Sequence, residues 1–142
     1  MLTGTLLHPE ILSALGRAGH GARVLIADGN FPCSTETPAT AAKVFLNLRR
    51  GMVTVTEVLK VLAGSIPIES ALVMTPPDGT VQPIHGEFEG ILPKDITISG
   101  KTRTEFYSET KSPATALVIA TGEERRFANI LITIGVIKPE AK

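Results

Sequence analysis

Short apolar runs that alternate with helix-like segments constrain the fold of this 142-residue chain more than any other feature. The runs are rich in Val, Ile and Leu and lie at residues 22–27, 68–75, 115–121 and 127–134. Segments with helical spacing or helix-start signals lie before and between them, at residues 9–18, 54–64, 83–92 and 103–111. Strands that are apolar on both faces need cover on both faces. The sequence therefore predicts an α/β fold, with a largely parallel sheet and helices on both faces.

Local signals refine this outline. Thr54 and Glu57 have the spacing of a capping box, in which each side chain binds the other residue's backbone N–H. A helix is therefore expected to begin at Thr54. Residues 96–99 alternate like a strand, whereas residues 43–48 fit either a strand or the end of a helix.

The length and the 43% hydrophobic content suit a single domain whose core is large enough to be stable without disulfides. The one cysteine, Cys33, leaves no internal disulfide and favours a reducing compartment. The N-terminus lacks the features of a secretory signal, and no apolar run approaches the roughly 20 residues that span a bilayer. We therefore expect a soluble, cytoplasmic domain over residues 1–137 and a flexible tail over residues 138–142.

Composition and motifs argue against several function classes. Fourteen Lys and Arg balance fourteen Asp and Glu, so no basic face for nucleic acid is indicated. Five Phe, one Tyr and no Trp leave few platforms on which bases could stack. The sequence has no His-Glu-x-x-His or carboxylate-rich metal motif and no glycine-rich phosphate loop. We therefore predict no metal site and neither nucleic acid nor a membrane as a partner.

His20 and Asp28 flank the first apolar run and are the main candidates for chemistry. Ligands of α/β sheets bind beyond the carboxyl ends of strands, where Asp28 is expected. His20 follows the first helix, and an imidazole can give and take protons near neutral pH. A tight helix-to-strand connection can bring the two into neighbouring loops without forcing them into contact. Each also has a structural interpretation, with His20 as a helix cap and Asp28 as the stabiliser of the turn at Gly29.

Five further residues have functional and structural interpretations. Arg103, at the start of a helix, can bind an oxygen-rich ligand or remain a solvated charge. Asn129, within the last apolar run, can offer its amide to a ligand or to a neighbouring loop. Cys33, without a paired histidine nearby, fits a small, partly buried thiol better than a nucleophile. His8 fits a solvent-facing helix start and His85 lies in a short helix, and neither belongs to a recognised motif.

Together these segments resemble the RbsD/FucU family of D-ribose pyranases and L-fucose mutarotases. The resemblance extends from Leu2 to Val136, and the segments that carry it occur in the family's order: Gly19-His20-Gly21, Asp28-Gly29-Asn30-Phe31-Pro32, Val58-Leu59-Lys60-Val61-Leu62, Arg103-x-x-Phe106-Tyr107, Gly122-Glu123, Phe127-Ala128-Asn129-Ile130-Leu131 and Gly135-Val136. It implies interconversion of the ring forms or anomers of a free monosaccharide without a cofactor. It also implies ring-like homo-oligomers, commonly decamers, with active sites at subunit contacts.

The resemblance further implies roles for individual residues. His20 matches the family's proton donor, and Asp28 matches an aspartate that binds the sugar. Arg103 matches a position that is arginine in fucose mutarotases and histidine in ribose pyranases, which favours the fucose type. Phe127-Ala128-Asn129 matches a tyrosine-x-asparagine element that contacts the sugar, although Phe127 lacks the phenolic hydroxyl.

The sequence thus predicts a mutarotase or pyranase that acts on L-fucose or a related sugar by general acid/base catalysis through His20. The missing hydroxyl at Phe127 leaves open a sugar-binding module without turnover. A third alternative is a scaffold that uses the fold only to assemble rings. With no Trp and a single Tyr, a sugar is expected to be held in a small pocket of polar groups rather than in a broad stacking groove.

Overall fold

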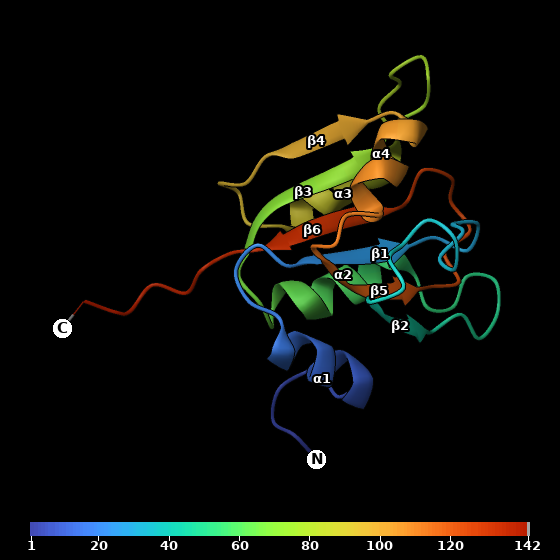
Figure 1. The fold of residues 1–142 in the computed structure, drawn as a ribbon. Helices are drawn as coiled ribbons and strands as arrows, with labels where there is room; N and C mark the ends of the chain where they lie inside the picture. Colours follow the sequence, from blue (N-terminus) through green and yellow to red (C-terminus); the bar gives the residue numbers. More distant parts are fainter. Residues whose placement is uncertain (142) are drawn as a thin grey trace.

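A computed structural model describes residues 1–141 and contains one six-stranded sheet with four helices packed against it (Figure 1). The elements in chain order are α1 (Pro9–Arg17), β1 (Arg23–Ala27), β2 (Ala42–Phe45), α2 (Val55–Ala63), β3 (Ile68–Met74), α3 (Pro83–Ile91), β4 (Ile98–Lys101), α4 (Arg103–Thr110), β5 (Thr115–Ala120) and β6 (Ile130–Ile134). The strand order across the sheet is β2-β5-β1-β6-β3-β4. The predicted single-domain α/β fold is confirmed.

The sheet is parallel except for β6. Strand β5 pairs in parallel with β1 and β2, and β3 pairs in parallel with β4. Strand β6 lies antiparallel between β1 and β3. The nine residues between β5 and β6 are fewer than the dozen or so that a parallel crossover requires, so the chain returns in the opposite direction.

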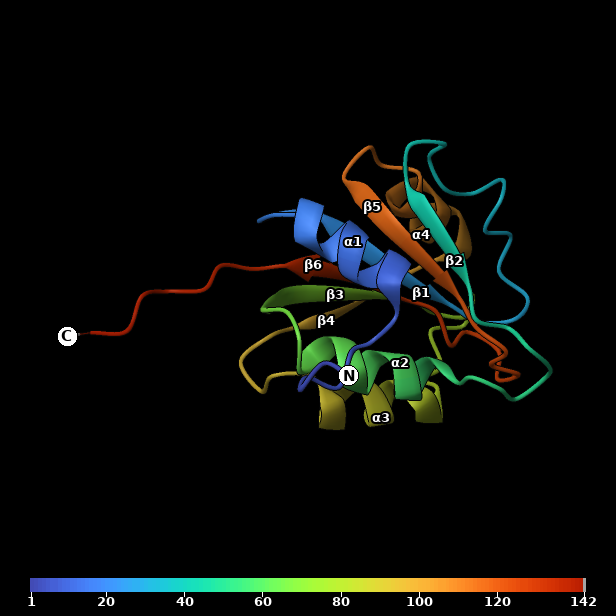
Figure 2. The same ribbon diagram turned by 90° about the horizontal axis from the view of Figure 1, so that it is seen from below.

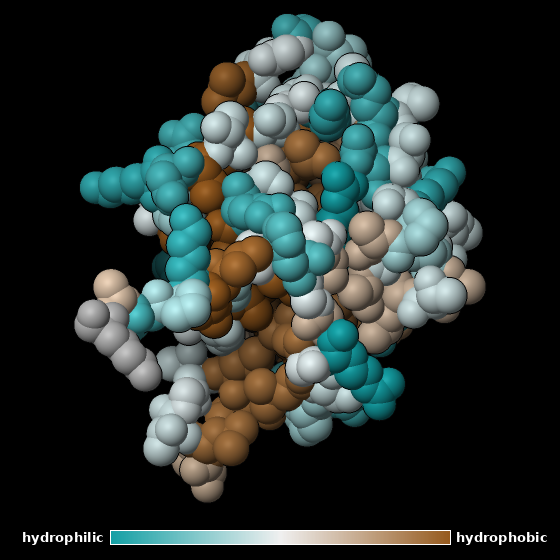
Figure 3. All heavy atoms as spheres, turned by 60° about the vertical axis from the view of Figure 1, so that its left-hand side comes forward, coloured by the Kyte–Doolittle hydropathy of each residue, from teal (hydrophilic) through white to brown (hydrophobic). Residues whose placement is uncertain are grey.

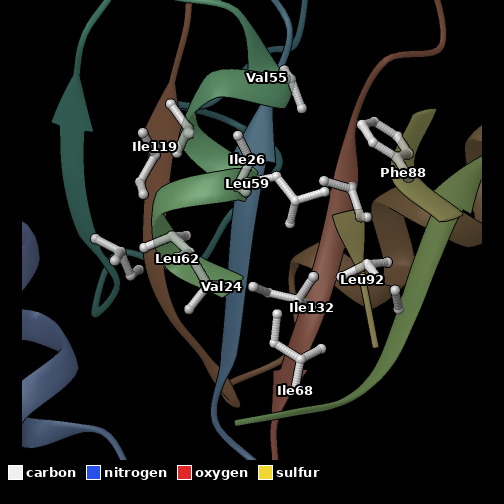
Figure 4. Packing of buried hydrophobic residues seen from close by; sticks show 14 of the residues in the cluster. Val24, Ile26, Val55, Leu59, Leu62, Ile68, Phe88, Leu92, Ile119 and Ile132 are labelled. Carbon is white, nitrogen blue, oxygen red and sulfur yellow. The ribbon is translucent and has the colours of Figure 1, made fainter. Parts of the chain in front are cut away.

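Both faces of the sheet are buried, as the apolar runs predict. Side chains alternate along β1, so that Val24 and Ile26 pack on one face while Leu25 packs on the other. Helices α1, α2 and α3 cover the first face (Figure 2), and Figure 4 shows Leu59 and Leu62 of α2 against the strands. Helix α4 and the loop after β1 cover the second face, where the main contacts come from Phe31, Cys33, Ala41 and Phe106.

The predicted start of the second helix is confirmed. The Thr54 hydroxyl accepts a hydrogen bond from the Glu57 N–H at 3.3 Å, and the Glu57 carboxylate accepts one from the Thr54 N–H at 2.8 Å. The first part of the ambiguous segment over residues 43–48 belongs to strand β2, which ends at Phe45, and residues 46–48 follow the strand. The strand predicted over residues 96–99 is shifted, because the backbone pairs with β3 only from Ile98 to Lys101.

The last strand is shorter than predicted, and this correction affects the site. Phe127 has a φ of 57°, a left-handed conformation that a β-strand cannot accommodate, so β6 begins only at Ile130. Asn129 therefore precedes the strand instead of lying within it. Hydropathy cannot detect this break, because Phe127 and Ala128 are as apolar as the strand that follows.

The N-terminal segment and the described residues after Gly135 lie away from the sheet's carboxyl edge (Figure 1). After Gly135 the chain leaves the body as an extended segment (Figure 1), and Lys142 of the expected tail lies outside the described residues.

An apolar groove of about 270 Å³ separates residues 6–11 from α2. Figure 3 shows apolar side chains gathered on the lower part of that view, at the height of α1 in Figure 1. No helix within residues 1–141 is long and apolar enough to cross a bilayer.

Candidate active site

Asp28 follows β1 directly, and its carboxylate is buried, with the residue only 5% exposed. The N–H of Asn30 donates to Oδ1 of Asp28 at 2.9 Å, which stabilises the turn at Gly29 as the structural interpretation predicted. Burial raises the pKa of the Asp28 carboxyl above its ordinary value, while the N–H groups of Asn30, Ala128 and Phe31 oppose the rise. The result is a desolvated carboxylate whose oxygens are oriented by the backbone.

A cavity of about 310 Å³ opens beside Asp28, on the side of the sheet edge that faces β2 and β5. Its other lining residues are Gly29, Phe31, Pro32, Cys33, Ser34, Thr35, Phe45, Asn47, Ala120 and Thr121. A second cavity of about 440 Å³ shares Gly29, Asn47 and Thr121 with it and extends toward Arg49 and Arg50. Both volumes fall within the range of about 300–1,000 Å³ that is typical of small-molecule sites.

Asn129 and Ala128 reach Asp28 from the β6 side. Asn129 is 3% exposed, and its Oδ1 accepts a hydrogen bond from the Asp28 N–H at 2.7 Å. This is the structural bond to a neighbouring loop that we offered as one interpretation of Asn129. The pairing of Ile26 with Ile130 places the end of β1 beside the start of β6, as Figure 1 shows. Asp28, Ala128 and Asn129 therefore form one cluster, in which Asn129 is hydrogen-bonded to Asp28 and the N–H of Ala128 favours the charged form of the Asp28 carboxyl by lowering its pKa.

Phe127 and Arg103 lie at the same edge of the sheet, farther from Asp28. The half-buried Phe127 ring packs against the second-face core, and the guanidinium carbon of Arg126 lies 5.6 Å from its centroid. Arg103 is the exposed first residue of α4 and forms no ion pair within residues 1–141. Two strands separate β4 from β1, so about 14 Å lies between the strand axes.

His20 lies at the opposite edge of the sheet, which corrects the expectation that it shares neighbouring loops with Asp28. His20 precedes β1 and Asp28 follows it, and a five-residue strand alone is about 16 Å long. The sequence already indicated this separation, because His20 and Asp28 lie at opposite ends of the same predicted strand. One chain therefore cannot bring the imidazole of His20 to a ligand bound at Asp28.

Glu69 pairs with His20 and was missed by sequence reasoning. Nε2 of His20 lies 2.9 Å from Oε2 of Glu69, and the two side chains are 60% and 45% exposed. The alternative role of His20 as a helix cap is not observed, because the ring meets this carboxylate. Glu69 belongs to no local motif, and only the β1-β6-β3 pairing brings its strand beside the turn that carries His20.

Three other buried polar residues surround the cluster. Cys33 is 6% exposed, and burial raises the pKa of its thiol to about 11, in keeping with a small buried thiol. Burial opposes ionisation of Glu123, but hydrogen bonds from Arg125 outweigh it and hold the pKa of Glu123 below its ordinary value. His85 on α3 is 6% exposed, and its Nε2 lies 3.1 Å from the carbonyl oxygen of Phe127. Sequence reasoning assigned no role to Glu123 or His85.

The chain is similar over most of its length to named sugar isomerases. The fucose mutarotase of Danio rerio is 32% identical to the chain, with 96% of this chain and 93% of that protein covered. The D-ribose pyranase of Clostridium botulinum is 26% identical, with 93% of this chain and 95% of that protein covered.

Solved structures share the fold. Bacillus subtilis RbsD, solved in complex with D-ribose, matches with a TM-score of 0.83 and 24% identity over 97% of this chain and all of that chain. The fucose mutarotase of Streptococcus pneumoniae, solved with L-fucose, matches with a TM-score of 0.73 and 25% identity over 92% of this chain and 94% of that chain. Residues 1–137 match the model of the RbsD / FucU transport protein family, and the chain belongs to that family.

Proposed function

We propose that this protein is a monosaccharide mutarotase or pyranase, an isomerase that interconverts the anomers or ring forms of a free sugar. The observation that carries the proposal is the buried Asp28 carboxylate, oriented by backbone N–H groups beside a cavity of about 310 Å³. A desolvated carboxylate with fixed oxygens is suited to accept hydrogen bonds from sugar hydroxyls. The membership of the chain in the RbsD/FucU family supports the same assignment.

The reaction needs a proton donor and a proton acceptor and no change in oxidation state. One group protonates the ring oxygen while another takes the proton of the anomeric hydroxyl, which opens the ring to the carbonyl form. Rotation about the exposed carbonyl bond and the reverse transfers then close the ring with the other configuration. We assign the acid/base role to His20 and the positioning of the sugar to Asp28 and Asn129.

The separation of His20 from Asp28 leads us to propose that each active site is shared between two copies of the chain. His20 and Glu69 are both exposed, so a neighbouring copy can approach them. The Glu69 carboxylate can only accept a hydrogen bond, which assigns the proton of neutral His20 to Nε2 and leaves Nδ1 free to exchange protons with a sugar. The homo-oligomer, a decamer by family resemblance, is part of this proposal.

For the substrate we propose L-fucose or a related sugar. Arg103 supports this choice, because arginine at this position is typical of the fucose type within the family. The fucose mutarotase of Danio rerio is also more similar to the chain than the Clostridium botulinum D-ribose pyranase, at 32% against 26% identity. We place the protein in the cytoplasm, where free monosaccharides are metabolised.

Exchange NMR on equilibrated sugars tests the proposal. Saturation of one anomeric proton is transferred to the other anomer in proportion to the interconversion rate, so the enzyme increases that transfer. We expect acceleration with L-fucose and weaker or no acceleration with D-ribose, D-galactose and D-glucose. Asp28→Asn removes the charge with little change of shape and should abolish the acceleration. Unchanged exchange for all four sugars would refute the enzymatic assignment.

A second candidate function is monosaccharide binding without turnover. It is favoured by Phe127, whose ring keeps an apolar face for a sugar but has no hydroxyl to donate or relay a proton. This alternative predicts saturable binding of L-fucose without accelerated exchange. It also predicts that Phe127→Tyr creates exchange activity, whereas the enzymatic assignment predicts that the wild-type chain already has it.

A further inference from the structure

His85 contacts the site from outside the residues assigned above. It lies in the first turn of α3, and its ring is stacked on Phe88, with centroids 6.1 Å apart and planes inclined by 27°. Phe88 is fully buried in the core and lies beside β6 (Figure 4), so the imidazole packs against a closely packed surface. Its Nε2 lies 3.1 Å from the carbonyl oxygen of Phe127.

The direction of this hydrogen bond follows from its chemistry. A backbone carbonyl can only accept, so Nε2 of His85 must carry a proton and donate it. The neutral ring is therefore the tautomer with its proton on Nε2. Phe127 needs such an external partner, because an aromatic residue with a φ of 57° occupies a conformation that L-residues rarely adopt unless the surroundings hold it there.

The carbonyl of Phe127 and the N–H of Ala128 belong to the same peptide group. In a trans peptide these two groups point in opposite directions from a rigid plane. The carbonyl points to His85, and the N–H acts on the Asp28 carboxylate, where it favours the charged form. Rotation of this plane would break both interactions together.

We propose that His85 is a positioning residue that fixes the Phe127–Ala128 peptide plane and thereby orients the Asp28 carboxylate. Its hydrogen bond also polarises the peptide, which strengthens the bond on the other side of the plane. The hydrogen bond of the His85 ring is made to the backbone carbonyl of Phe127, so His85 acts on Asp28 through the backbone. Only its effect on sugar binding rests on the proposed mutarotase function, because the effect on Asp28 does not require a ligand.

Three variants of full-length protein test the inference. His85→Leu removes the donor but keeps an apolar side chain against Phe88. His85→Gln places an amide N–H near the position of Nε2 and should restore the bond. Ile84→Val, one residue earlier on the same helix and 2% exposed, loosens the core without removing the donor. It therefore controls for a general loss of packing around α3.

NMR distinguishes loss of the His85 hydrogen bond from a general loss of packing, because it reports on the His85 ring, the Ala128 amide and the Asp28 carboxyl separately. In the wild-type chain we expect the ¹⁵N signals of the His85 ring to show a protonated Nε2. In His85→Leu we expect a shifted Ala128 amide signal and a further rise in the pKa of Asp28, measured from its ¹³C carboxyl signal. His85→Gln and Ile84→Val should retain the wild-type values. The affinity for L-fucose should fall about tenfold in His85→Leu and recover in His85→Gln.

The outcomes separate this inference from the proposed function. A bare Nε2 in the wild-type chain would overturn it, as would a His85→Leu variant whose Asp28 pKa matches that of Ile84→Val. Equal behaviour of the Leu and Gln variants would also overturn it. If the wild-type chain neither binds nor interconverts any sugar while the Ala128 and Asp28 signals change as expected, the mutarotase proposal fails and the role of His85 stands.

Discussion

The two edges of the sheet differ in how firmly they hold their candidate functional residues. At the carboxyl edge, Asp28 and Asn129 are 5% and 3% exposed and are joined by a hydrogen bond of 2.7 Å. At the opposite edge, the His20 side chain is 60% exposed and meets one partner, Glu69, which is itself 45% exposed. The candidate residues at the carboxyl edge are buried and hydrogen-bonded to each other, whereas those at the opposite edge are accessible to solvent.

This difference matches the roles that we propose for the two edges. A group that binds a sugar gains from fixed geometry, because little freedom is then lost when the ligand arrives. A proton donor supplied to a neighbouring copy must instead remain accessible until the copies assemble. The comparison therefore predicts that changes at the His20 edge alter activity alone, and that changes at the Asp28 edge also alter stability.

The largest expected effect is on activity at the His20 edge. His20→Ala should lower the exchange rate of L-fucose anomers about 100- to 10,000-fold, because it removes the general acid/base. Its free energy of unfolding should stay within about 0.5 kcal/mol of the wild-type value, because the side chain is exposed. Arg17→Ala, an exposed change on the same helix-and-turn unit, serves as the control and should retain activity. Full activity in His20→Ala would remove this histidine from the mechanism.

Mixed oligomers test whether the two edges serve one site. His20→Ala and Asp28→Asn should each be inactive alone. When the two are unfolded and refolded together in equal amounts, about a quarter of the shared sites should combine an intact His20 with an intact Asp28. We expect exchange activity to return to that level, measured by NMR against each variant refolded by itself. Activity that stays at the level of the separate variants would mean that copies do not complete each other's sites.

A stability effect is expected at the Asp28 edge. Asn129→Ala leaves the buried N–H of Asp28 without its acceptor, which should cost about 1–3 kcal/mol of unfolding free energy. Urea denaturation followed by circular dichroism measures this cost. Asn30→Ala is the matched control, because its backbone N–H to Asp28 remains and its side chain is exposed. The comparison between the edges fails if Asn129→Ala is as stable as this control.

The smallest expected effect is a pH dependence of stability that comes from Asp28. Burial raises the pKa of this carboxyl above 3.8, so the folded state binds the proton more tightly than the unfolded state does. The contribution to stability is therefore complete below the unfolded pKa and is lost as the pH rises through the folded pKa. Asp28→Asn cannot ionise, so its stability relative to the wild-type chain should increase between about pH 3 and pH 7. Urea midpoints across this range measure the change, and a difference that is constant or reversed with pH would contradict it.

Local patterns predicted most of the fold. The capping box at Thr54 and Glu57 formed as expected, because both of its bonds lie within one turn of the chain. The break before β6 escaped prediction, because the backbone of Phe127 is held by His85 from α3, which is 42 residues away in the sequence. The candidate site divided in the same way, since Asp28 could be proposed from its position after an apolar run and Asn129 as a polar residue within one, whereas no local pattern pointed to Glu69.

The sequence by itself determined which segments become helices and strands and which polar side chains stand at their ends. These properties depend on side-chain periodicity and capping over a few residues. Only the tertiary structure decided the strand order, the reversed direction of β6 and the partners of His20 and Asp28. Those features depend on which distant segments pair across the sheet, and pairing is selected by the packing of the whole core rather than by any local pattern. For the same reason, two residues eight positions apart are held at opposite edges of the sheet by the strand between them.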